Sequence, residues 1–183
     1  EKFDYQLLNT EKSCYKDIQF KKIIFAEGMG VKENPFFSEI PVEPNKGHNL
    51  EVKLSKRIEE DFTLKKKHFL FPLNNENYYY GGTYDREQTH HKIDDSAVDK
   101  LTQSLAEFYP DDFAVQEIKF GFRPTVKDRR PILGNHSKYT NLFVFNGLGA
   151  RGILNGNYFA INLYNHLENS EAIHPDVNLN RFG

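Results

Sequence analysis

One short segment combines residue types that could bind a carboxylate. Residues 121–125 read Gly-Phe-Arg-Pro-Thr, so a proline restrains the backbone directly beside Arg123. A guanidinium that is held still can bind a carboxylate through two parallel hydrogen bonds. A surface salt bridge is the alternative for this arginine, because most exposed arginines form ordinary ion pairs.

A second segment is rich in glycine. Residues 147–154 read Gly-Leu-Gly-Ala-Arg-Gly-Ile-Leu, after an apolar run at 141–146 and before a proline-free stretch that ends near Glu168. This order predicts a strand, a tight turn and a helix. The first N–H groups of a helix have no partner within it, so they suit a negative charge or a polarised carbonyl oxygen. The glycines would let a flat cofactor approach the backbone closely, and an ordinary strand-to-helix turn is the alternative.

Composition narrows the class of protein. The net charge of the 183-residue chain is −2 with both signs intermixed, which argues against a nucleic-acid partner. The lone cysteine, Cys14, excludes a disulfide framework and indicates a reducing compartment, so we expect a cytoplasmic protein. No apolar run approaches the roughly 18 residues of a membrane span, and no secretory signal opens the chain. The pair His90-His91 has no ligand-type neighbours, so no metal site is expected.

Periodicity predicts two kinds of element. Continuous apolar runs at 22–28 and 141–147 predict buried parallel strands. Between them, alternating patterns predict an antiparallel sheet with strands at 48–54, 67–72, 78–84 and 115–123.

Two helices are predicted. The first spans 94–109, with a capping box at Ser96 and Asp99 and one apolar stripe. The second, ending near Glu168, carries two apolar ridges, so we expect it to be well buried. One ridge comprises Leu154, Tyr158 and Ile161, and the other comprises Phe159, Leu163 and Leu167.

The order of these segments is similar to that of the D-amino-acid oxidase and glycine oxidase family of FAD-dependent oxidoreductases. The resemblance runs from about residue 20 to residue 182. It implies an α+β fold: residues 40–137 form an antiparallel-sheet substrate-binding domain with a helix, while 1–39 and 138–183 supply the closing strands and C-terminal helix of a Rossmann-like FAD-binding domain. The residues that carry it are Glu27-Gly28, Pro41 to Lys46-Gly47, Gly81-Gly82-Thr83, Gly121-Phe122-Arg123-Pro124, Asp128 to Gly134, and Gly147 to Gly152.

The resemblance also implies roles for single residues. Arg123 takes the position of the arginine that grips the substrate carboxylate. Phe69 stands where the family often has a tyrosine as a second anchor, and Tyr84 is among the tyrosines that could compensate. The residues implied to bind the cofactor are Gly28, Lys46 and Gly47, with a structural turn as the alternative for the last two, and the flavin-edge loop Gly149, Ala150, Arg151, Gly152, Ile153 and Leu154.

The implied activity is oxidation of the C–N bond of an amino acid or related amine, by hydride transfer to FAD. No general base is required if the amine binds unprotonated, so no catalytic residue is predicted. The chain opens at Glu1, and we expect the family's N-terminal FAD-binding segment to be its partner in a longer protein; this chain alone is expected to be inactive. One alternative is the oxidase domain of a tRNA-uridine-modifying enzyme, suggested by Gly149-Ala150-Arg151-Gly152. The other is a ligand-binding module without redox chemistry.

Overall fold

The chain divides into two compact units. The computed structural model describes residues 3–58, 62–74 and 76–183. Unit 1 comprises residues 1–44 and 123–183, and unit 2 comprises residues 45–122. The units therefore divide after residues 44 and 122, whereas the sequence predicts domain boundaries after residues 39 and 137. The assignment of one part to the cofactor and the other to the substrate stays a prediction.

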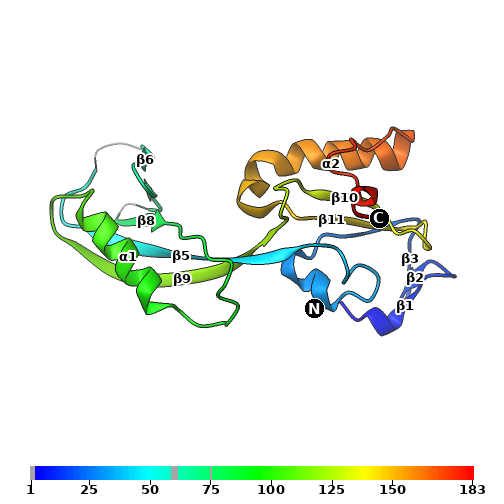
Figure 1. Cartoon of the computed structure of the whole chain (residues 1–183), viewed down its shortest axis with the longest axis horizontal. Helices are drawn as coiled ribbons and strands as arrows, with labels where there is room; N and C mark the ends of the chain where they lie inside the picture. The colour runs from blue at the N-terminus through cyan, green and yellow to red at the C-terminus, as the bar shows by residue number, and fades with distance from the viewer. Residues whose placement is uncertain (1–2, 59–61, 75) are drawn as a thin grey trace. The chain divides into compact units, whose positions relative to one another are not determined.

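Unit 2 is built on a sheet of long and short strands in the order β6-β7-β8-β5-β9. The pairs β6–β7, β7–β8 and β8–β5 are antiparallel, as predicted. Helix α1 (Asp95–Ala106) lies across one face of this sheet (Figure 1). The strands are β5 (Glu43–Leu54), β6 (Leu64–Lys65), β7 (Phe69–Pro72), β8 (Asn77–Gly81) and β9 (Phe113–Thr125).

Alternation in β5 explains why α1 packs there. Leu50 and Val52 occupy every second position of the strand and are fully buried, together with Leu101 and Leu105 of the helix. Because successive side chains of a strand point to opposite faces, this spacing directs one apolar row at the helix. The predicted stripe of α1 is thus confirmed as the side that faces the sheet.

The predicted start of α1 is wrong in detail. Ser96 lies inside the helix, and the N-cap residue is Asp94, whose side chain makes no capping hydrogen bond among the described residues. The Asp94 carboxylate is instead 2.9 Å from the ammonium of Lys46 and 2.8 Å from Nε2 of His90. An ion pair with a strand residue therefore replaces the capping box.

Unit 1 contains a separate sheet in the order β10-β11-β4. Strand β11 (Leu142–Asn146) pairs parallel with β4 (Ile23–Phe25) and antiparallel with β10 (Ile132–Asn135). The predicted parallel pair and its separation from the larger sheet are thus confirmed. Leu142 and Val144 belong to the core on one face, whereas Phe143 packs with α2 (Gly152–Asn169) on the other, which accounts for the continuous apolar run.

Helix α2 is less buried than predicted. Its ridge of Phe159, Leu163 and Leu167 packs against the sheet. The ridge containing Tyr158 and Ile161 faces away from this core, and Tyr158 is 68% exposed. The expectation of a well-buried helix is therefore wrong for this chain, because only one side of the helix meets the sheet.

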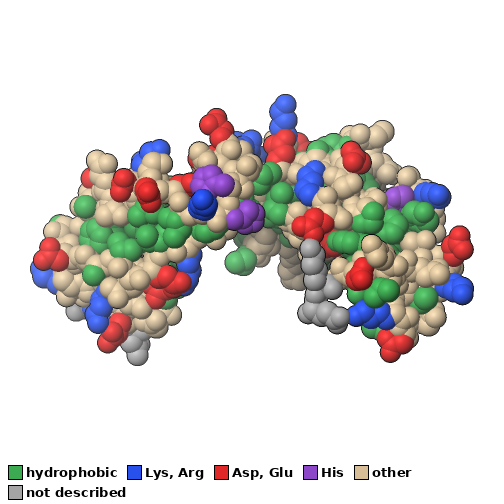
Figure 2. Space-filling view, turned by 90° about the horizontal axis from the view of Figure 1, so that it is seen from below, with side chains coloured by type: hydrophobic (Ala, Val, Ile, Leu, Met, Phe, Trp, Pro, Cys, Tyr) green, Lys and Arg blue, Asp and Glu red, His purple; other side chains and the backbone are tan. Residues whose placement is uncertain are grey.

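Several short elements give no periodic pattern in the sequence and were not predicted. They are the 3-10 helices η1 (Tyr5–Leu7), η2 (Gly28–Glu33), η3 (Gly149–Arg151) and η4 (Leu179–Phe182), and the small antiparallel sheet of β1 (Leu8–Asn9), β2 (Cys14–Tyr15) and β3 (Ile18–Gln19). Among the described residues, no helix has the length and apolar character needed to cross a membrane. Charged side chains of both signs are interspersed over the face shown in Figure 2.

Candidate functional site

The carboxyl ends of the parallel strands β4 and β11 are tied together by one side chain. Asn146, the last residue of β11, is buried. Its Nδ2 donates to the carbonyl oxygen of Gly28 at 2.9 Å, and its Oδ1 accepts from the N–H of Gly147 at 2.8 Å. Asn146 was not among the predicted residues, although a polar residue that ends an apolar run is a signal that could have found it.

The segment after Arg123 reaches both glycine turns. A Cβ added to Gly28 would lie 3.8 Å from Cγ of Pro124. One added to Gly149 would lie 3.4 Å from Cγ2 of Thr125. The structure therefore brings together the turn after β4, the turn after β11 and the end of β9.

Two of the glycines in the second turn are required by the backbone. Gly147 has φ +72° and Gly149 has φ +55°, in the left-handed region that favours glycine. At Gly147 a Cβ would also meet Cγ2 of Val126 at 2.6 Å. The Val126 side chain thus packs against Gly147 and leaves no room for a larger residue, whereas at Gly149 the nearest atom, Cγ2 of Thr125, is 3.4 Å away.

The start of α2 offers backbone donors to a ligand. Within the described residues, neither η3 nor α2 has a side-chain cap, and Ile153 at the first turn is fully exposed at 103%. The first N–H groups of a helix have no partner within it. The N–H of Arg151 already donates to the carbonyl oxygen of Leu148 at 3.2 Å, so the donors that this turn can offer to carbonyl or anionic oxygens are the N–H groups of its other residues.

The spacing of Gly147, Gly149 and Gly152 is that of a G-x-G-x-x-G turn between a strand and a helix. In a complete dinucleotide-binding unit a second parallel strand follows the helix. Here α2 leads into a loop and η4, and residues 170–183, all of which the structure describes, contain an isolated bridge between Asn178 and Leu133 but no strand. Residues 147–152 thus have the local form of the motif's first turn.

The predicted substrate residues fall on both units. Arg123 is half-buried near the end of β9 and is the first residue of the second stretch of unit 1. Phe69 begins β7 in unit 2, is 43% exposed and pairs with Gly81 of β8. Tyr84 follows β8 and is 65% exposed.

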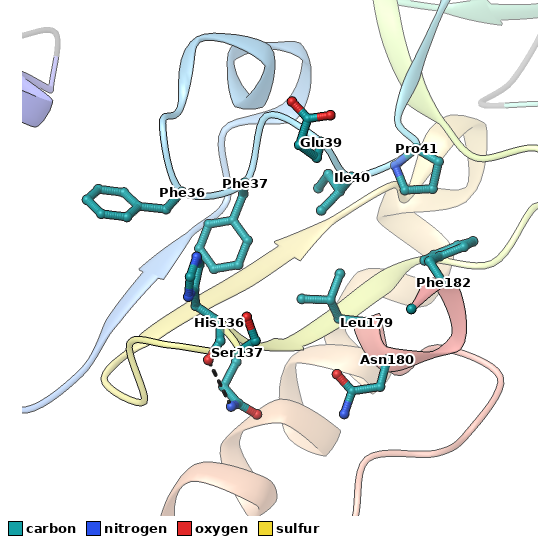
Figure 3. Close-up of a pocket in the computed structure, with 12 residues that line it drawn as sticks. Phe36, Phe37, Glu39, Ile40, Pro41, His136, Ser137, Leu179, Asn180 and Phe182 are labelled. Atoms are coloured by element: carbon teal, nitrogen blue, oxygen red, sulfur yellow. Dashed lines mark hydrogen bonds between the residues drawn. The ribbon is translucent and has the colours of Figure 1, made fainter.

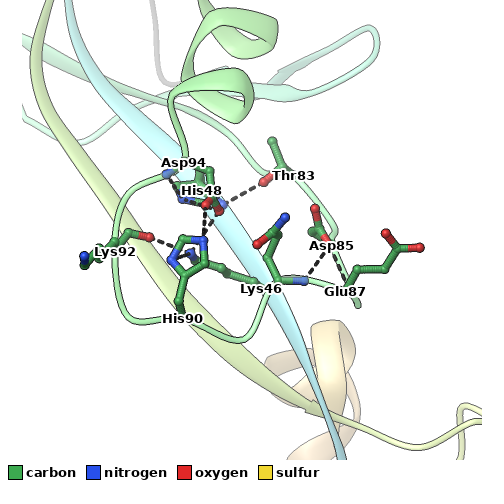
Figure 4. Close-up of polar contacts among 9 residues, drawn as sticks. Lys46, His48, Thr83, Asp85, Glu87, His90, Lys92 and Asp94 are labelled. Carbon is green, nitrogen blue, oxygen red and sulfur yellow. Dashed lines mark hydrogen bonds and ion pairs between the residues drawn. The ribbon is translucent and has the colours of Figure 1, made fainter.

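The Lys46 side chain points into unit 2, the unit to which Lys46 belongs. Its side chain has no exposed area, and its ammonium lies 2.9 Å from Oδ2 of Asp94 (Figure 4). The hydrogen bond from Lys46 holds the pKa of Asp94 below its ordinary value, against the opposing effect of burial. Gly47 is buried beside it. Sequence reasoning missed Asp94, because an ion pair between residues 46 and 94 leaves no local pattern.

A separate cavity of about 490 Å³ lies in unit 1 (Figure 3). His136 lines it; Nδ1 of this ring accepts from the N–H groups of Lys138 and Tyr139, so the ring proton lies on Nε2. Burial, with Lys138 nearby, lowers the pKa of His136. None of the predicted site residues lines this cavity, which is formed by Phe36, Phe37, Glu39, Ile40, Pro41, Asn135, His136, Ser137, Leu179, Asn180, Phe182 and Gly183.

Known proteins resemble this chain in sequence and in fold. It is 31% identical over 145 residues to the bifunctional protein ThiO/ThiG of Trichormus variabilis, covering 75% of this chain and 21% of that protein. Iminodiacetate oxidase from Chelativorans sp. BNC1 superposes with a TM-score of 0.74 at 21% identity, over 88% of this chain and 47% of that one. Glycine oxidase from Geobacillus kaustophilus gives 0.73 at 21% identity, over 85% and 43%.

The chain thus spans less than half the length of these relatives. The sequence profile described as "FAD dependent oxidoreductase" (DAO) matches residues 5–161. That match includes the Gly28 turn, the end of β9 and the glycine loop before α2. The chain therefore belongs to the DAO family of FAD-dependent oxidoreductases, whose cofactor is FAD.

Proposed function

We propose that the protein containing this chain oxidises the C–N bond of an amino acid or related amine. The observation that carries the proposal is the meeting of the Gly28 turn, the glycine loop and the segment after Arg123 at the carboxyl ends of β4 and β11. Ligands of open α/β sheets bind at this end of the strands. Two of the similar structures are oxidases named for amino acids, glycine and iminodiacetate.

The glycine loop fits the cofactor of the family. The start of α2 has no side-chain cap among the described residues, and Gly149, at a left-handed position, places no side-chain atoms in the approach. When bound, FAD would supply the acceptor for the hydride that leaves the carbon bearing the amine. The loop would stabilise negative charge that grows on the cofactor's polar edge. Gly28 would line the same site, while Lys46 and Gly47 have the least support, because the Lys46 ammonium is enclosed by other partners.

Arg123 would hold the substrate carboxylate. A planar fork beside a proline can donate two charge-assisted hydrogen bonds and so fix the C–H bond to be broken. Phe69 would give an apolar contact in place of a hydroxyl, and Tyr84 would provide a hydroxyl from the neighbouring segment. No side chain is assigned as a general base, because an amine that binds unprotonated needs none.

The exposed ridge of α2 supports a further covering segment in the complete protein. Large exposed apolar patches mark surfaces that meet another surface. The occupant we propose is the family's N-terminal FAD-binding segment. The residues that it would cover are Ile153, Leu154, Tyr158, Ile161 and Tyr164.

The two alternatives gain less support. A tRNA-modifying oxidase would need a basic channel for the phosphate backbone, whereas the net charge is −2 and the face in Figure 2 carries both signs. A ligand-binding module without redox chemistry could use the same glycine loop, but the similar structures named above are both oxidases.

The test uses the complete protein and two glycine substitutions. Gly149→Val would place a branched side chain at a left-handed position, and we expect the visible absorption of bound oxidised flavin to be lost with oxidation of glycine-like amines. Gly121→Ala is the control, because a Cβ there meets nothing within 4 Å. Equal flavin content in the folded Gly149→Val and Gly121→Ala proteins would remove the loop from the cofactor site. Wild-type protein that binds FAD and oxidises no amine would refute the proposed activity.

A further inference from the structure

A buried ammonium anchors the segment between β8 and α1. The Lys46 ammonium has no exposed area, and its partner Asp94 is 14% exposed. The Lys46 ammonium also donates to the carbonyl oxygen of Lys92 and lies 3.3 Å from Nδ1 of His90. A charge withdrawn from water is tolerated only when its hydrogen-bonding capacity is met, so this set of contacts must form together. The rings of Phe120 and Phe122 lie beneath the ammonium at 5.0 and 5.9 Å.

The same strand holds the beginning of the segment through its backbone. Residue 46 exchanges two backbone hydrogen bonds with Asp85, of 2.7 and 2.8 Å. The carbonyl oxygen of His48 accepts from the N–H of Thr83 at 3.0 Å, and the N–H of His48 donates to Oγ1 of Thr83 at 2.8 Å. Both ends of the segment 83–94 are thus fastened to residues 46 and 48 of β5 (Figure 4).

His48 connects the two fastenings. Its Nε2 accepts from the N–H of Asp94 at 3.2 Å, so the neutral ring carries its proton on Nδ1. That nitrogen is buried and has no hydrogen-bond partner among the described residues. His48 therefore holds both ends of the segment. Its side chain accepts from the N–H of Asp94, directly before α1, and its backbone bonds to Thr83.

Tyr84 lies between the two backbone fastenings. It follows Thr83 and precedes Asp85, and its side chain is 65% exposed. A side chain in this position has its backbone fixed on both sides while its ring stays open to solvent. The backbone hydrogen bonds to β5 hold Tyr84 at one end of the segment, and the ion pair holds the other end at Asp94.

We propose that Lys46 and Asp94 form a clasp that positions the Tyr84 segment for substrate binding, acting through the segment and not by contact with the substrate. The clasp is defined as the ion pair Lys46–Asp94. This role rests on the proposed function for its substrate, whereas the clasp itself rests on the contacts within unit 2. The clasp makes the two residues determinants of substrate affinity rather than of the chemical step.

The test measures backbone hydrogen exchange and steady-state kinetics in the complete flavoprotein. Asp94→Asn removes the charge and keeps the shape, and Lys46→Met removes the ammonium and keeps the length. We expect the N–H groups of Thr83 and Asp85 to exchange at least about tenfold faster in both variants, since breaking a buried ion pair is strongly destabilising. Lys53→Met is the control. Lys53 lies on β5, like Lys46, but its ion pair with Glu76 is exposed.

The kinetic measurement separates positioning from general stability. We expect KM for the amine to rise about tenfold or more in the clasp variants, with kcat changed much less. Unchanged exchange at Thr83 and Asp85, or equal acceleration throughout unit 2, would overturn the clasp. Faster local exchange with an unaltered KM would overturn its positioning role. Failure of the wild type to oxidise any amine would refute the proposed function, and the exchange measurement would still decide by itself whether the clasp exists.

Discussion

The two units of the chain differ in how far each buries its own helix and side chains. In unit 2, helix α1 buries its single apolar stripe against the sheet, and even the ammonium of Lys46 is enclosed by partners from the same unit. In unit 1, helix α2 buries one ridge and exposes another, and its first turn has no side-chain cap among the described residues. Unit 2 therefore buries its helix stripe and its lysine ammonium within itself, apart from Oδ1 of Asn45 and Nδ1 of His48, which have no hydrogen-bond partner among the described residues. Unit 1 exposes an apolar ridge and the start of a helix, which suit further partners.

The largest expected effect contrasts the two helices. Leu105→Ala removes a fully buried side chain from the core of unit 2 and should lower the free energy of unfolding of this chain by about 2–5 kcal/mol. Ile161→Ala on the exposed ridge of α2 should change it by no more than about 0.5 kcal/mol. Urea unfolding of the chain measures both.

Repeating the pair in the complete protein sharpens the contrast. The cost of Ile161→Ala should rise there toward that of a buried residue, because the covering segment would bury the ridge. An equally small cost in the complete protein would mean that this ridge stays open to water, and the contrast between the units would fail.

A second prediction concerns function without loss of fold. Arg123→Met in the complete protein should lower kcat/KM for carboxylate-bearing amines by about a hundredfold or more, because two charge-assisted hydrogen bonds of roughly 1.5–3 kcal/mol each are lost. Flavin content should not change. An amine without a carboxylate should lose much less, since no charged group is left unpaired.

The pair of substrates distinguishes a binding residue from a structural one. If Arg123 only ties segments of the chain together, both substrates should lose activity equally and the protein should be less stable. Steady-state kinetics with both amines, on wild type and variant, decides between these outcomes.

The third prediction concerns the tie between the parallel strands of unit 1. Asn146→Ala leaves the carbonyl oxygen of Gly28 and the N–H of Gly147 without their partner, so it should lower the free energy of unfolding by about 1–3 kcal/mol. Flavin affinity should fall with it, because both turns of the proposed cofactor site lose their common fastening. Asn141→Ala is the comparison at the other end of β11, and there flavin affinity should be unaffected.

The repeating apolar patterns predicted the longer strands and the two helices. Pairings between residues that lie far apart in the sequence could not be predicted from such patterns. Alternation located β5 and β9, and the continuous apolar runs located β4 and β11 with their parallel pairing. The two-residue strands β1 to β3 have no period to detect. Apolar ridges indicate that a surface will be buried but not by what, which is why the burial of α2 was overestimated.

The candidate site likewise has parts that the sequence predicted and parts that it did not. Glycine spacing and the Gly-Phe-Arg-Pro order marked the loop before α2 and the end of β9. The clasp was missed because the local pattern at Ser96 and Asp99 satisfied the rules for a helix start, while the true N-cap, Asp94, is bound to a lysine 48 positions earlier in the chain. Tertiary ion pairs of this kind become visible only when the strand and the helix are placed in space.

The smallest predicted effect is a loss of protection at acid pH in unit 2. Burial is the main reason that the pKa of His48 lies below its ordinary value; Lys46 and His90 lower it further, and Asp94 and Asp85 oppose them. Protonation would turn Nε2 into a donor facing the N–H of Asp94 and would add a positive charge beside Lys46. Because the folded-state pKa is the lower one, protection should be complete above the unfolded pKa of about 6.5 and be lost as pH falls through the folded value.

This acid sensitivity should be confined to the segment that the clasp holds. Protection factors at Thr83 and Asp85, measured from neutral pH down to about pH 5, should fall before those in the core of α1. Asp94 remains ionised over this range, since its own pKa is depressed. His48→Gln is the matched variant: its amide oxygen can accept from the N–H of Asp94 without titrating, so its protection should not depend on pH. The same decline in His48→Gln as in the wild type would assign the effect to another group, and the clasp would then keep its partners in acid as firmly as the rest of unit 2 does.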